Sequence, residues 1–452
     1  MQSATARCPA LLVAAPASGQ GKTTVVAALA RLHARQGRRV RVFKCGPDFL
    51  DPHWHQLASG APVHSLDLWI NGAEDCAARL HAAAQEADLV LIEGVMGLFD
   101  GDPSAADLAR HFGVPVLAVV DASAMAGTFG ALAHGLRHYQ ADLPWAGVLA
   151  NRVAGDRHAE MLQRGLREPG DWLGALPRVA LADGALAGKP AALLPERHLG
   201  LVAAHELPDA MDRLDAAADA LAATPLGQMD AADLQRWAVD FPAPPAPQPV
   251  PPLLAGRTVA VARDAAFSFI YPANIDTLAQ LGARVRFFSP LAGDALPACD
   301  AVWLPGGYPE LHAAQLAAHH GLQNDLRAHL AAGKPLWAEC GGMLALFESL
   351  RLHDGSVQAM WGLLPGTAAM QPRLASLGPR QIDLAGQVLR GHSFHYSTAD
   401  CSAPVLARSS RPGGQDADGE PLYAHGSLRA SYFHAWFASN PVAVAQLLGG
   451  AA

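Results

Sequence analysis

The feature that most restricts the fold of this chain is a short apolar run that leads directly into a glycine-rich turn and a Lys-Thr pair. Residues 11–15 are apolar, and Pro16-Ala17-Ser18-Gly19-Gln20-Gly21-Lys22-Thr23-Thr24 follows them. This order predicts a buried strand, a tight turn and a helix whose N-terminal N–H groups face an anion. The usual pattern has glycine at the position of Pro16, so this turn is a variant. The segment predicts a phosphate-binding loop within an α/β fold.

Two other interpretations fit the same N-terminal residues. Arg7, the apolar run and the small residues after it resemble a secretion signal, but the run is short and leads into the Gly-Lys-Thr turn. A glycine-rich turn with a surface lysine is the second alternative, which the flanking strand and helix disfavour. In a phosphate loop, Lys22 would reach the terminal phosphates of ATP, and the Thr23 hydroxyl would bind Mg²⁺. The predicted ATP-binding residues of the loop are Ser18, Gly19, Gln20, Gly21, Lys22, Thr23 and Thr24.

Length, charge and cysteine usage exclude several classes of protein. A chain of 452 residues is too long for one core, so two domains are expected. The net charge of −8 comes without a basic run, which argues against a nucleic-acid partner. No segment reaches the roughly 20 apolar residues that span a bilayer. The six cysteines are scattered without CxxC spacing, so neither disulfides nor a zinc site is expected, and a cytoplasmic location fits best.

A proline-rich stretch divides the chain. Proline lacks an N–H and restricts the residue before it, so residues 241–256 predict an extended linker between a domain at 1–240 and another at 257–452. Short apolar runs alternate with helical stretches on both sides of the linker, as in βαβ units that build a buried parallel sheet. The predicted strands are residues 11–15, 40–43, 89–92, 116–120, 147–150 and 199–203, then 258–262, 285–288, 301–304 and 335–338.

Two acidic clusters follow predicted strands of the first domain. Asp48 and Asp51 come just after residues 40–43, while Glu93 ends the run 89–92 and Asp100 follows in a glycine-rich turn. Ligands of open α/β sheets bind at the carboxyl edge of the strands, and carboxylate oxygens suit Mg²⁺. We therefore expect Asp48 and Glu93 to bind Mg²⁺ together with Thr23, and Asp51 and Asp100 to position the substrate carboxylate or the phosphoryl group. An isolated loop aspartate is otherwise usually a turn residue.

A cysteine lies at a predicted strand-to-helix turn of the second domain. The segment Leu336-Trp337-Ala338-Glu339-Cys340-Gly341-Gly342 predicts an exposed sulfur, with the Gly341 N–H aimed at a developing oxyanion. The pair Gly306-Gly307 after another strand can donate a second N–H, and we assign this role to Gly307. A base must generate the thiolate, and histidines occur in residues 390–397 and 431–436. The alternative is a small core cysteine, the role we assign to the other five.

Together these motifs resemble a known family of corrin-amidating enzymes, the cobyrinic acid a,c-diamide synthases. The second half is similar to class I glutamine amidotransferase domains with a flavodoxin-like α/β fold. The first half is similar to the dethiobiotin-synthetase-like P-loop ATPase domain of the same enzymes. The matching segments occur in order along nearly the whole chain: KCGPDFLDP from Lys44, IEGVMGLFDG from Ile92, ARDAAFSFIYPAN from Ala262, PGGYPE from Pro305, ECGG and GHSFHYS.

The resemblance implies an ATP- and glutamine-dependent carbon–nitrogen ligase that amidates the a and c side chains of a corrin ring in cobalamin biosynthesis. It implies Cys340 as the nucleophile, His434 as its base and Asn151 as a contact to adenine. Class I triads continue His-Pro-Glu, whereas this chain has His434-Ala435-Trp436, so the orienting glutamate is missing from its usual place. Whether Glu310 or another group replaces it stays open. Mg²⁺ is the expected cofactor, the corrinoid the expected partner, and a homodimer is compatible with the family.

Two alternatives remain from the sequence. The first is a,c-diamidation of a different tetrapyrrole, such as nickel sirohydrochlorin. The second is a regulatory P-loop ATPase fused to an inert amidotransferase domain, which Cys340 and His434 argue against.

Overall fold

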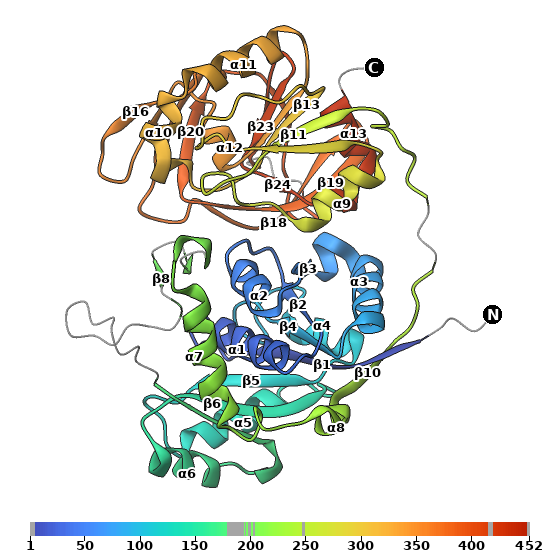
Figure 1. Cartoon of the computed structure of the whole chain (residues 1–452), viewed down its shortest axis with the longest axis vertical. Coiled ribbons are helices and arrows are strands. Elements are labelled where there is room, and N and C mark those ends of the chain that lie inside the picture. Colours follow the sequence, from blue (N-terminus) through green and yellow to red (C-terminus); the bar gives the residue numbers. More distant parts are fainter. Residues whose placement is uncertain are drawn as a thin grey trace. The chain divides into compact units, whose positions relative to one another are not determined.

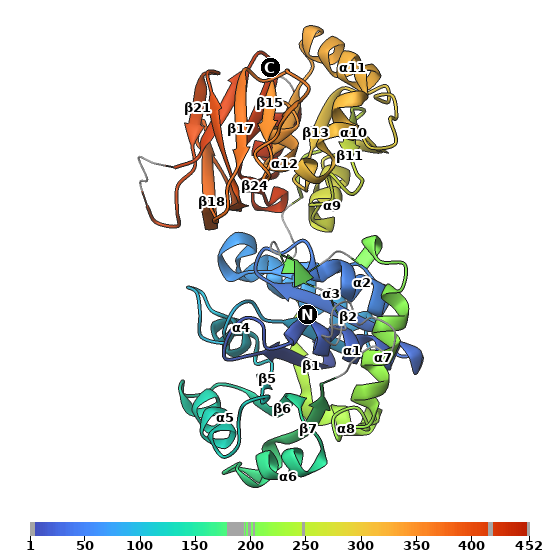
Figure 2. The same cartoon turned by 90° about the vertical axis from the view of Figure 1, so that its left-hand side faces the viewer.

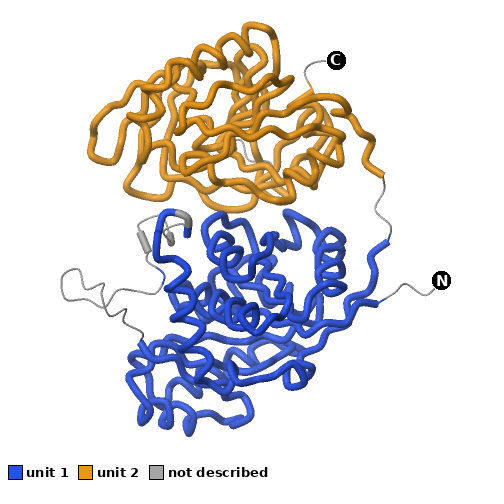
Figure 3. Tube along the Cα trace, in the orientation of Figure 1, with its two compact units in different colours: residues 1–247 blue, residues 248–452 orange. Residues whose placement is uncertain are grey.

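The computed structural model describes residues 5–178, 194, 196–197, 200–201, 204–245, 249–414 and 419–449. The chain forms two compact units, Met1–Pro247 and Gln248–Ala452, which Figure 3 colours separately. Each unit has its own sheet and core, and each is described by itself. Within the described residues, no helix has both the length and the apolar character needed to cross a membrane.

The first unit contains a parallel sheet with strand order β3-β2-β4-β1-β5-β6-β7, and β10 pairs antiparallel with β1. The strands are β1 (Ala6–Ala14), β2 (Val40–Cys45), β3 (His64–Leu66), β4 (Leu89–Glu93), β5 (Val116–Asp121), β6 (Trp145–Val153), β7 (Trp172–Pro177) and β10 (Ala238–Phe241). Strand order reverses at β1, with β4 on one side and β5 on the other. In open α/β sheets such a switch point is where ligands bind.

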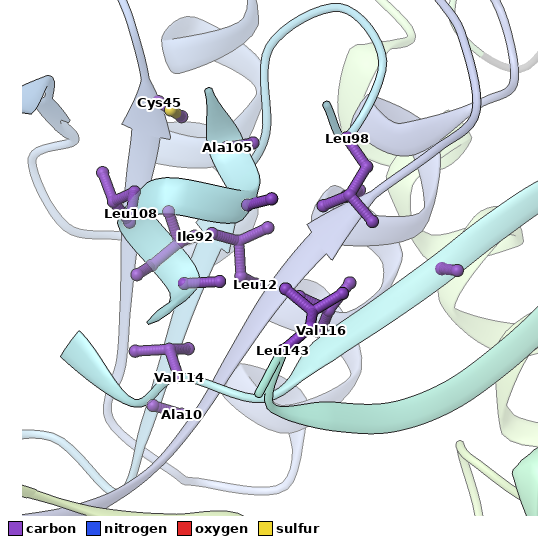
Figure 4. Packing of buried hydrophobic residues seen from close by; sticks show 14 of the residues in the cluster. Ala10, Leu12, Cys45, Ile92, Leu98, Ala105, Leu108, Val114, Val116 and Leu143 are labelled. Atoms are coloured by element: carbon purple, nitrogen blue, oxygen red, sulfur yellow. The ribbon is translucent and has the colours of Figure 1, made fainter. Parts of the chain in front are cut away.

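Helices cover both faces of this sheet (Figure 1). Leu12 packs into one core and its neighbours Leu11 and Val13 into the other, because successive side chains of a strand point to opposite faces. One face is covered by α1 (Lys22–Arg35), α2 (Asp51–Ser59), α7 (Ala210–Ala222) and the short α8 (Ala231–Leu234). The other is covered by α3 (Ala73–Glu86), α4 (Ala105–Phe112), α5 (Thr128–His138) and α6 (Asp156–Arg164). Figure 4 shows Leu12, Ile92, Leu108 and Val116 in the core beneath α3, α4, α5 and α6.

The first five predicted strands of this unit are strands in the structure. The sixth prediction, residues 199–203, is only partly described: Gly200–Leu201 forms β9, which pairs with β8 (Glu196–Arg197) outside the main sheet, and the other three residues lie outside the described part. The sheet continues instead with β7, whose apolar pattern is interrupted by glycine and ends in proline. Phe241, where the predicted linker begins, is the last residue of β10 and pairs with Ala6.

The second unit is built on a sheet with strand order β12-β11-β13-β14-β23-β22-β21, parallel from β12 to β23 and antiparallel beyond. The four strands predicted from sequence are its parallel core. The strands are β11 (Thr258–Ala262), β12 (Arg284–Phe288), β13 (Ala301–Leu304), β14 (Leu336–Glu339), β21 (Val405–Arg408), β22 (Pro421–His425) and β23 (Leu428–Ser431). The helices are α9 (Pro272–Gln280), α10 (Ala313–Ala318), α11 (His320–Ala331), α12 (Gly341–Leu344) and α13 (Pro441–Gly449).

Two smaller sheets flank this core, and Figure 2 shows β15, β17 and β18 beside it. One consists of β15 (Ser349–Arg351), β16 (Val357–Ala359), β17 (Gly366–Met370) and β20 (Ser397–Cys401). The other consists of β18 (Ser376–Leu384), β19 (Gln387–His395) and β24 (His434–Ala435). Both units therefore have the α/β architecture that the sequence predicts, with an additional antiparallel part in the second.

Candidate functional site

The glycine-rich loop joins β1 to α1 in the manner predicted. Gly21 immediately precedes α1 with φ of 96°, a left-handed conformation that favours glycine. A Cβ at Gly21 would lie 2.2 Å from Nδ2 of Asn151. The buried Lys22 ammonium donates to the carbonyl oxygens of Met96 (2.6 Å) and Ala17 (3.2 Å). Burial lowers the pKa of Lys22, and these two carbonyls hold its head group beside the loop.

Asn151 supports this loop from β6. Its Nδ2 donates to the carbonyl oxygen of Gln20 at 2.8 Å, and its Oδ1 accepts the N–H of Arg152 at 2.9 Å. The Gln20 side chain in turn accepts the N–H of Asp121 at 2.8 Å. Both ends of the Asn151 amide therefore hold backbone groups in place. An adenine contact by Asn151 stays a prediction.

Three carboxylates surround one buried lysine at the carboxyl ends of β2 and β4. The ammonium of Lys44 lies 2.5 Å from Asp51 Oδ2, 3.0 Å from Glu93 Oε1 and 3.6 Å from Asp48 Oδ2. The Lys44 side chain is only 4% exposed, so its charge depends on these partners. Burial alone would lower the pKa of Lys44, but Asp51 and Glu93 hold it well above its usual value. Lys44 therefore keeps its charge despite its burial.

Thr23 and His55 complete the surroundings of Glu93. The Thr23 hydroxyl donates to Glu93 Oε1 at 2.7 Å and lies 3.3 Å from Asp51 Oδ2, while His55 Nε2 contacts Glu93 Oε2. Although burial raises the pKa of Glu93, Lys44 and His55 together hold it well below its usual value. Burial and the neighbouring Asp48 raise the pKa of Asp51. Glu93 is thus held in its ionised form more firmly than Asp51.

The structure brings together most of the acidic residues singled out from sequence. Thr23, Asp48, Asp51 and Glu93 meet around Lys44. Asp100 is exposed, and its Oδ2 accepts the N–H of Gly97 at 2.8 Å, so it closes the turn after β4. Sequence reasoning missed Lys44 and His55. The signal for Lys44 was a lysine next to the apolar residues of the strand VRVFKC, since lysine is rarely buried without a partner.

In the second unit, Cys340 lies at a sharp turn between β14 and α12. Its φ of 44° and ψ of −108° are strained for a residue with a side chain, as predicted for this turn. The prediction that the sulfur is exposed is wrong, because Cys340 is only 6% exposed and packs into the core of this unit. Its N–H donates to the carbonyl of Ser431 at 2.8 Å, which fixes the turn against β23. A Cβ on Gly341 would lie 2.8 Å from the backbone nitrogen of Gly307, so the two segments predicted to donate N–H groups are in close contact.

The environment of Cys340 disfavours its charged form. The thiol lies 3.9 Å from the carbonyl oxygen of Phe394, to which it can donate. Burial raises the pKa of Cys340 well above its usual value, and the carboxylates of Glu420 and Glu310 raise it further. A base is therefore required before this sulfur can act as a nucleophile.

His434 begins β24 and lies against the turn that precedes Cys340. Its Nδ1 is 4.0 Å from Oε2 of Glu339, the residue immediately before the cysteine. The other oxygen of Glu339 accepts from Trp337 Nε1 at 2.7 Å and from the N–H of Ala435 at 3.3 Å. Burial raises the pKa of Glu339 to about 8, and burial lowers the pKa of His434 well below its usual value. Glu339 thus faces the predicted base, a role that sequence reasoning did not assign to it.

Two further histidines of β19 lie near His434. The ring of His392 stacks on that of His434 with centroids 4.8 Å apart, and burial lowers the pKa of His392 to about 3. His395 Nε2 lies 2.7 Å from Glu420 Oε1, and its ring stacks on Tyr432 at 3.7 Å. The segment GHSFHYS therefore supplies groups near the candidate base, although neither of its histidines was predicted to be the base.

Two family models match separate parts of the chain. Residues 11–191 match the model of the CobQ/CobB/MinD/ParA nucleotide binding domain. Residues 258–442 match the model of the CobB/CobQ-like glutamine amidotransferase domain. These matches confirm the predicted fold class, a P-loop domain followed by a class I glutamine amidotransferase domain.

Full-length relatives are more specific. The chain is 55% identical to the hydrogenobyrinate a,c-diamide synthase of Pseudomonas aeruginosa, over 99% of this chain and 98% of the relative. It is 56% identical to the enzyme of that name from Stutzerimonas stutzeri, over 98% of each chain. It is 47% identical to the cobyrinate a,c-diamide synthase of Herminiimonas arsenicoxydans, over 99% of this chain and 98% of the relative. The chain belongs to the family of hydrogenobyrinate and cobyrinate a,c-diamide synthases.

Proposed function

We propose that this protein uses ATP and glutamine to amidate the a- and c-side-chain carboxylates of hydrogenobyrinic or cobyrinic acid in cobalamin biosynthesis. One observation carries the proposal: this chain, a member of the family, contains both kinds of site. A Gly-Lys-Thr loop lies beside a carboxylate cluster in the first unit, and Cys340 lies beside a Glu339–His434 pair in the second. The first suits phosphoryl transfer and the second suits the release of ammonia from an amide. The proposal includes a cytoplasmic location, no nucleic-acid or membrane partner, and a homodimer as one compatible assembly.

The first step is activation of the substrate carboxylate. Its oxygen attacks the γ-phosphorus of ATP, the bond from that phosphorus to the bridging oxygen breaks, and ADP leaves with the electron pair. The product is an acyl phosphate. Lys22 follows the loop at the N-terminus of α1, where an ammonium group and backbone N–H groups stabilise phosphate charge. Lys44 holds Asp51 and Glu93 in fixed positions beside Thr23.

The residues of the carboxylate cluster fit a magnesium ion. Mg²⁺ prefers hard oxygen donors and usually takes one or two carboxylates in addition to phosphate oxygens. Glu93 has a depressed pKa, and the Thr23 hydroxyl is directed at it. Thr23, Glu93 and Asp48 would hold the ion, which when bound would neutralise charge on the phosphates. Asp51 is tied most closely to Lys44 and is left to position the carboxylate or phosphoryl group. Asp100 acts through the turn that it closes.

The second step takes place at Cys340. The sulfur attacks the side-chain amide carbon of glutamine while His434 accepts the thiol proton. Nδ1 of His434 faces Glu339, which leaves Nε2 to receive that proton. The N–H groups of Gly307 and Gly341 stabilise the oxyanion. Collapse of the tetrahedral intermediate breaks the carbon–nitrogen bond, the proton passes from His434 to the leaving nitrogen, and ammonia departs. Water then hydrolyses the thioester to glutamate, and ammonia attacks the acyl phosphate to give the amide and phosphate.

The test separates the two half-reactions. Cys340→Ala should abolish amidation with glutamine and leave amidation with ammonium salts intact, as measured by the mass added to each corrinoid. Cys401→Ala is the matched control, because Cys401 is half-buried on β20 and has no role in the proposal. The two-site mechanism would be contradicted if Cys340→Ala lost amidation with both glutamine and ammonium salts while Cys401→Ala kept both activities.

The same assay distinguishes the alternatives. The wild type is incubated separately with cobyrinic acid, hydrogenobyrinic acid and nickel sirohydrochlorin. The compound that gains two amides is the substrate. A regulatory ATPase with an inert second domain would instead consume ATP without a corrinoid and release no glutamate from glutamine.

A further inference from the structure

A group of metal-ligating side chains lies outside both sites described above. His134 and His138 are four residues apart on α5, so they lie on one face of that helix. Both approach the same carboxylate: His134 Nδ1 and His138 Nε2 are each 3.2 Å from Oε1 of Glu168. Among the described residues, these three form a group whose ligand atoms all lie within 4.8 Å of one another. We propose that His134, His138 and Glu168 form a binding site for a divalent transition-metal ion of the zinc type.

The ligand chemistry and spacing fit such an ion. Zinc binds imidazole nitrogens and carboxylate oxygens at about 2.0–2.2 Å, and tetrahedral ligands at that distance lie about 3.3 Å apart. The two nitrogen–oxygen distances here are already 3.2 Å. The two rings have centroids 4.5 Å apart and are tilted by 48°, so both can face one point. Two imidazoles and one carboxylate leave a fourth position for water, as in open zinc sites.

The chain holds Glu168 in place from both sides. A Cβ on Gly130 of α5 would lie 1.8 Å from the carbonyl oxygen of Gly165, so α5 and the segment before Glu168 are in direct contact. Figures 1 and 2 both show α5 next to α6, which leads into this segment. On the other side, Asp171 pairs with Arg137 of α5 at 2.7 Å. The Arg137 guanidinium thus has a partner other than Glu168, and the chain is anchored to α5 on both sides of Glu168.

This site lies at the other edge of the sheet from the predicted chemistry of its unit. The phosphate loop, Lys44 and Glu93 lie at the carboxyl ends of β1, β2 and β4. α5 follows β5 and runs back towards the amino ends of the strands, so its last turn, with His134 and His138, lies at the opposite edge. Glu168 likewise precedes the start of β7. A bound ion would therefore fasten α5 to the segment that enters β7, away from the predicted chemistry.

The experiment uses the full-length protein and Zn²⁺ as the probe. Equilibrium dialysis without nucleotide should show that wild type binds one more equivalent of Zn²⁺, with a Kd below about 10 μM, than His134→Ala or Glu168→Gln. The matched control is His111→Ala, an exposed histidine at the end of α4, which should bind as wild type does. Equal stoichiometry in wild type and both site variants would overturn the proposal, as would weak binding by all four proteins.

A measurement on the wild type keeps the test independent of the variants' folding. X-ray absorption of protein loaded with one equivalent of Zn²⁺ should show nitrogen and oxygen ligands, including two imidazoles. Coordinated sulfur would place the ion at a cysteine and overturn the assignment. Glutaminase activity of His134→Ala should equal that of wild type, because the site lies outside the predicted catalytic groups.

Discussion

Replacing Glu339 by glutamine tests how the predicted base of the thiol site is oriented. Oε1 of Glu339 accepts from Trp337 Nε1 and from the N–H of Ala435. In Glu339→Gln these donors would select the amide oxygen for that position, so the amide NH₂ would take the place of Oε2, 4.0 Å from Nδ1 of His434. An NH₂ group there favours the tautomer with a bare Nδ1 and a protonated Nε2. That tautomer cannot accept the proton of Cys340.

The expected loss of activity follows from this change of tautomer. The corresponding Asp-to-Asn change in a serine protease lowers kcat about 10⁴-fold. Because the contact here is 4.0 Å rather than a close hydrogen bond, we expect a glutaminase loss of about 10²–10³-fold above pH 8, where Glu339 is ionised, which is below that limit. Amidation with ammonium salts should not change. The matched control is Glu310→Gln, a second buried glutamate near Cys340 and the other candidate for the missing triad member.

The pH profile provides a second, independent readout. Burial raises the pKa of Glu339 to about 8, so below that pH the carboxyl is mostly protonated and cannot accept from His434. Glutaminase kcat/KM of wild type should therefore rise with pH and level off above about 8, and Glu339→Gln should lack this limb. Persistence of the limb in Glu339→Gln together with its loss in Glu310→Gln would refute the assignment and favour Glu310.

The same shift predicts how stability depends on pH. A rise in the pKa of Glu339 from 4.5 to about 8 corresponds, at 1.36 kcal/mol per unit, to about 5 kcal/mol as an upper limit. Because the folded state keeps the proton, this contribution is fully present below pH 4.5 and is lost as pH rises through about 8. In urea unfolding at pH 5 to 9, the free energy of wild type should therefore fall relative to that of Glu339→Gln. A difference that is constant with pH would contradict the raised pKa.

Three further substitutions test the contacts of both units. Lys44→Met leaves buried carboxylates without their cation and should lower the free energy of unfolding by about 3–5 kcal/mol, measured with urea; a change below 1 kcal/mol would contradict the buried pairing. Gly21→Ala places a Cβ against Asn151 at a φ of 96° and should abolish ATP hydrolysis, with only partial recovery in Gly21→Ala/Asn151→Ala. Gly307→Ala places a Cβ 2.1 Å from the carbonyl oxygen of Ala266 and should abolish glutaminase activity while ammonium-dependent amidation persists.

The features that could be predicted from sequence are those encoded by contiguous residues. The phosphate loop and the Cys340 turn are each a strand, a turn and a helix in succession, so residue order alone defines them. Glu339 was overlooked because its role depends on β24, which arrives from nearly one hundred residues further along the chain. Lys44 was quoted but given no function, because its pairing with Glu93 depends on β4, which comes much later in the chain. Asp100 differs from both, because its contact is with Gly97, three residues away, and closes a turn.

The pKa shifts at the two sites have opposite effects on charge. Around Lys44 and Glu93, pairing outweighs burial, and both groups have pKa values shifted towards their charged forms. Around Cys340, burial dominates, and the pKa values of Cys340, Glu339 and His434 are all shifted towards their neutral forms. In the proposed mechanism the first environment stabilises phosphate charge. The second penalises NH₄⁺ as it penalises any other ion, so it releases nitrogen as neutral ammonia, the form that can attack an acyl phosphate.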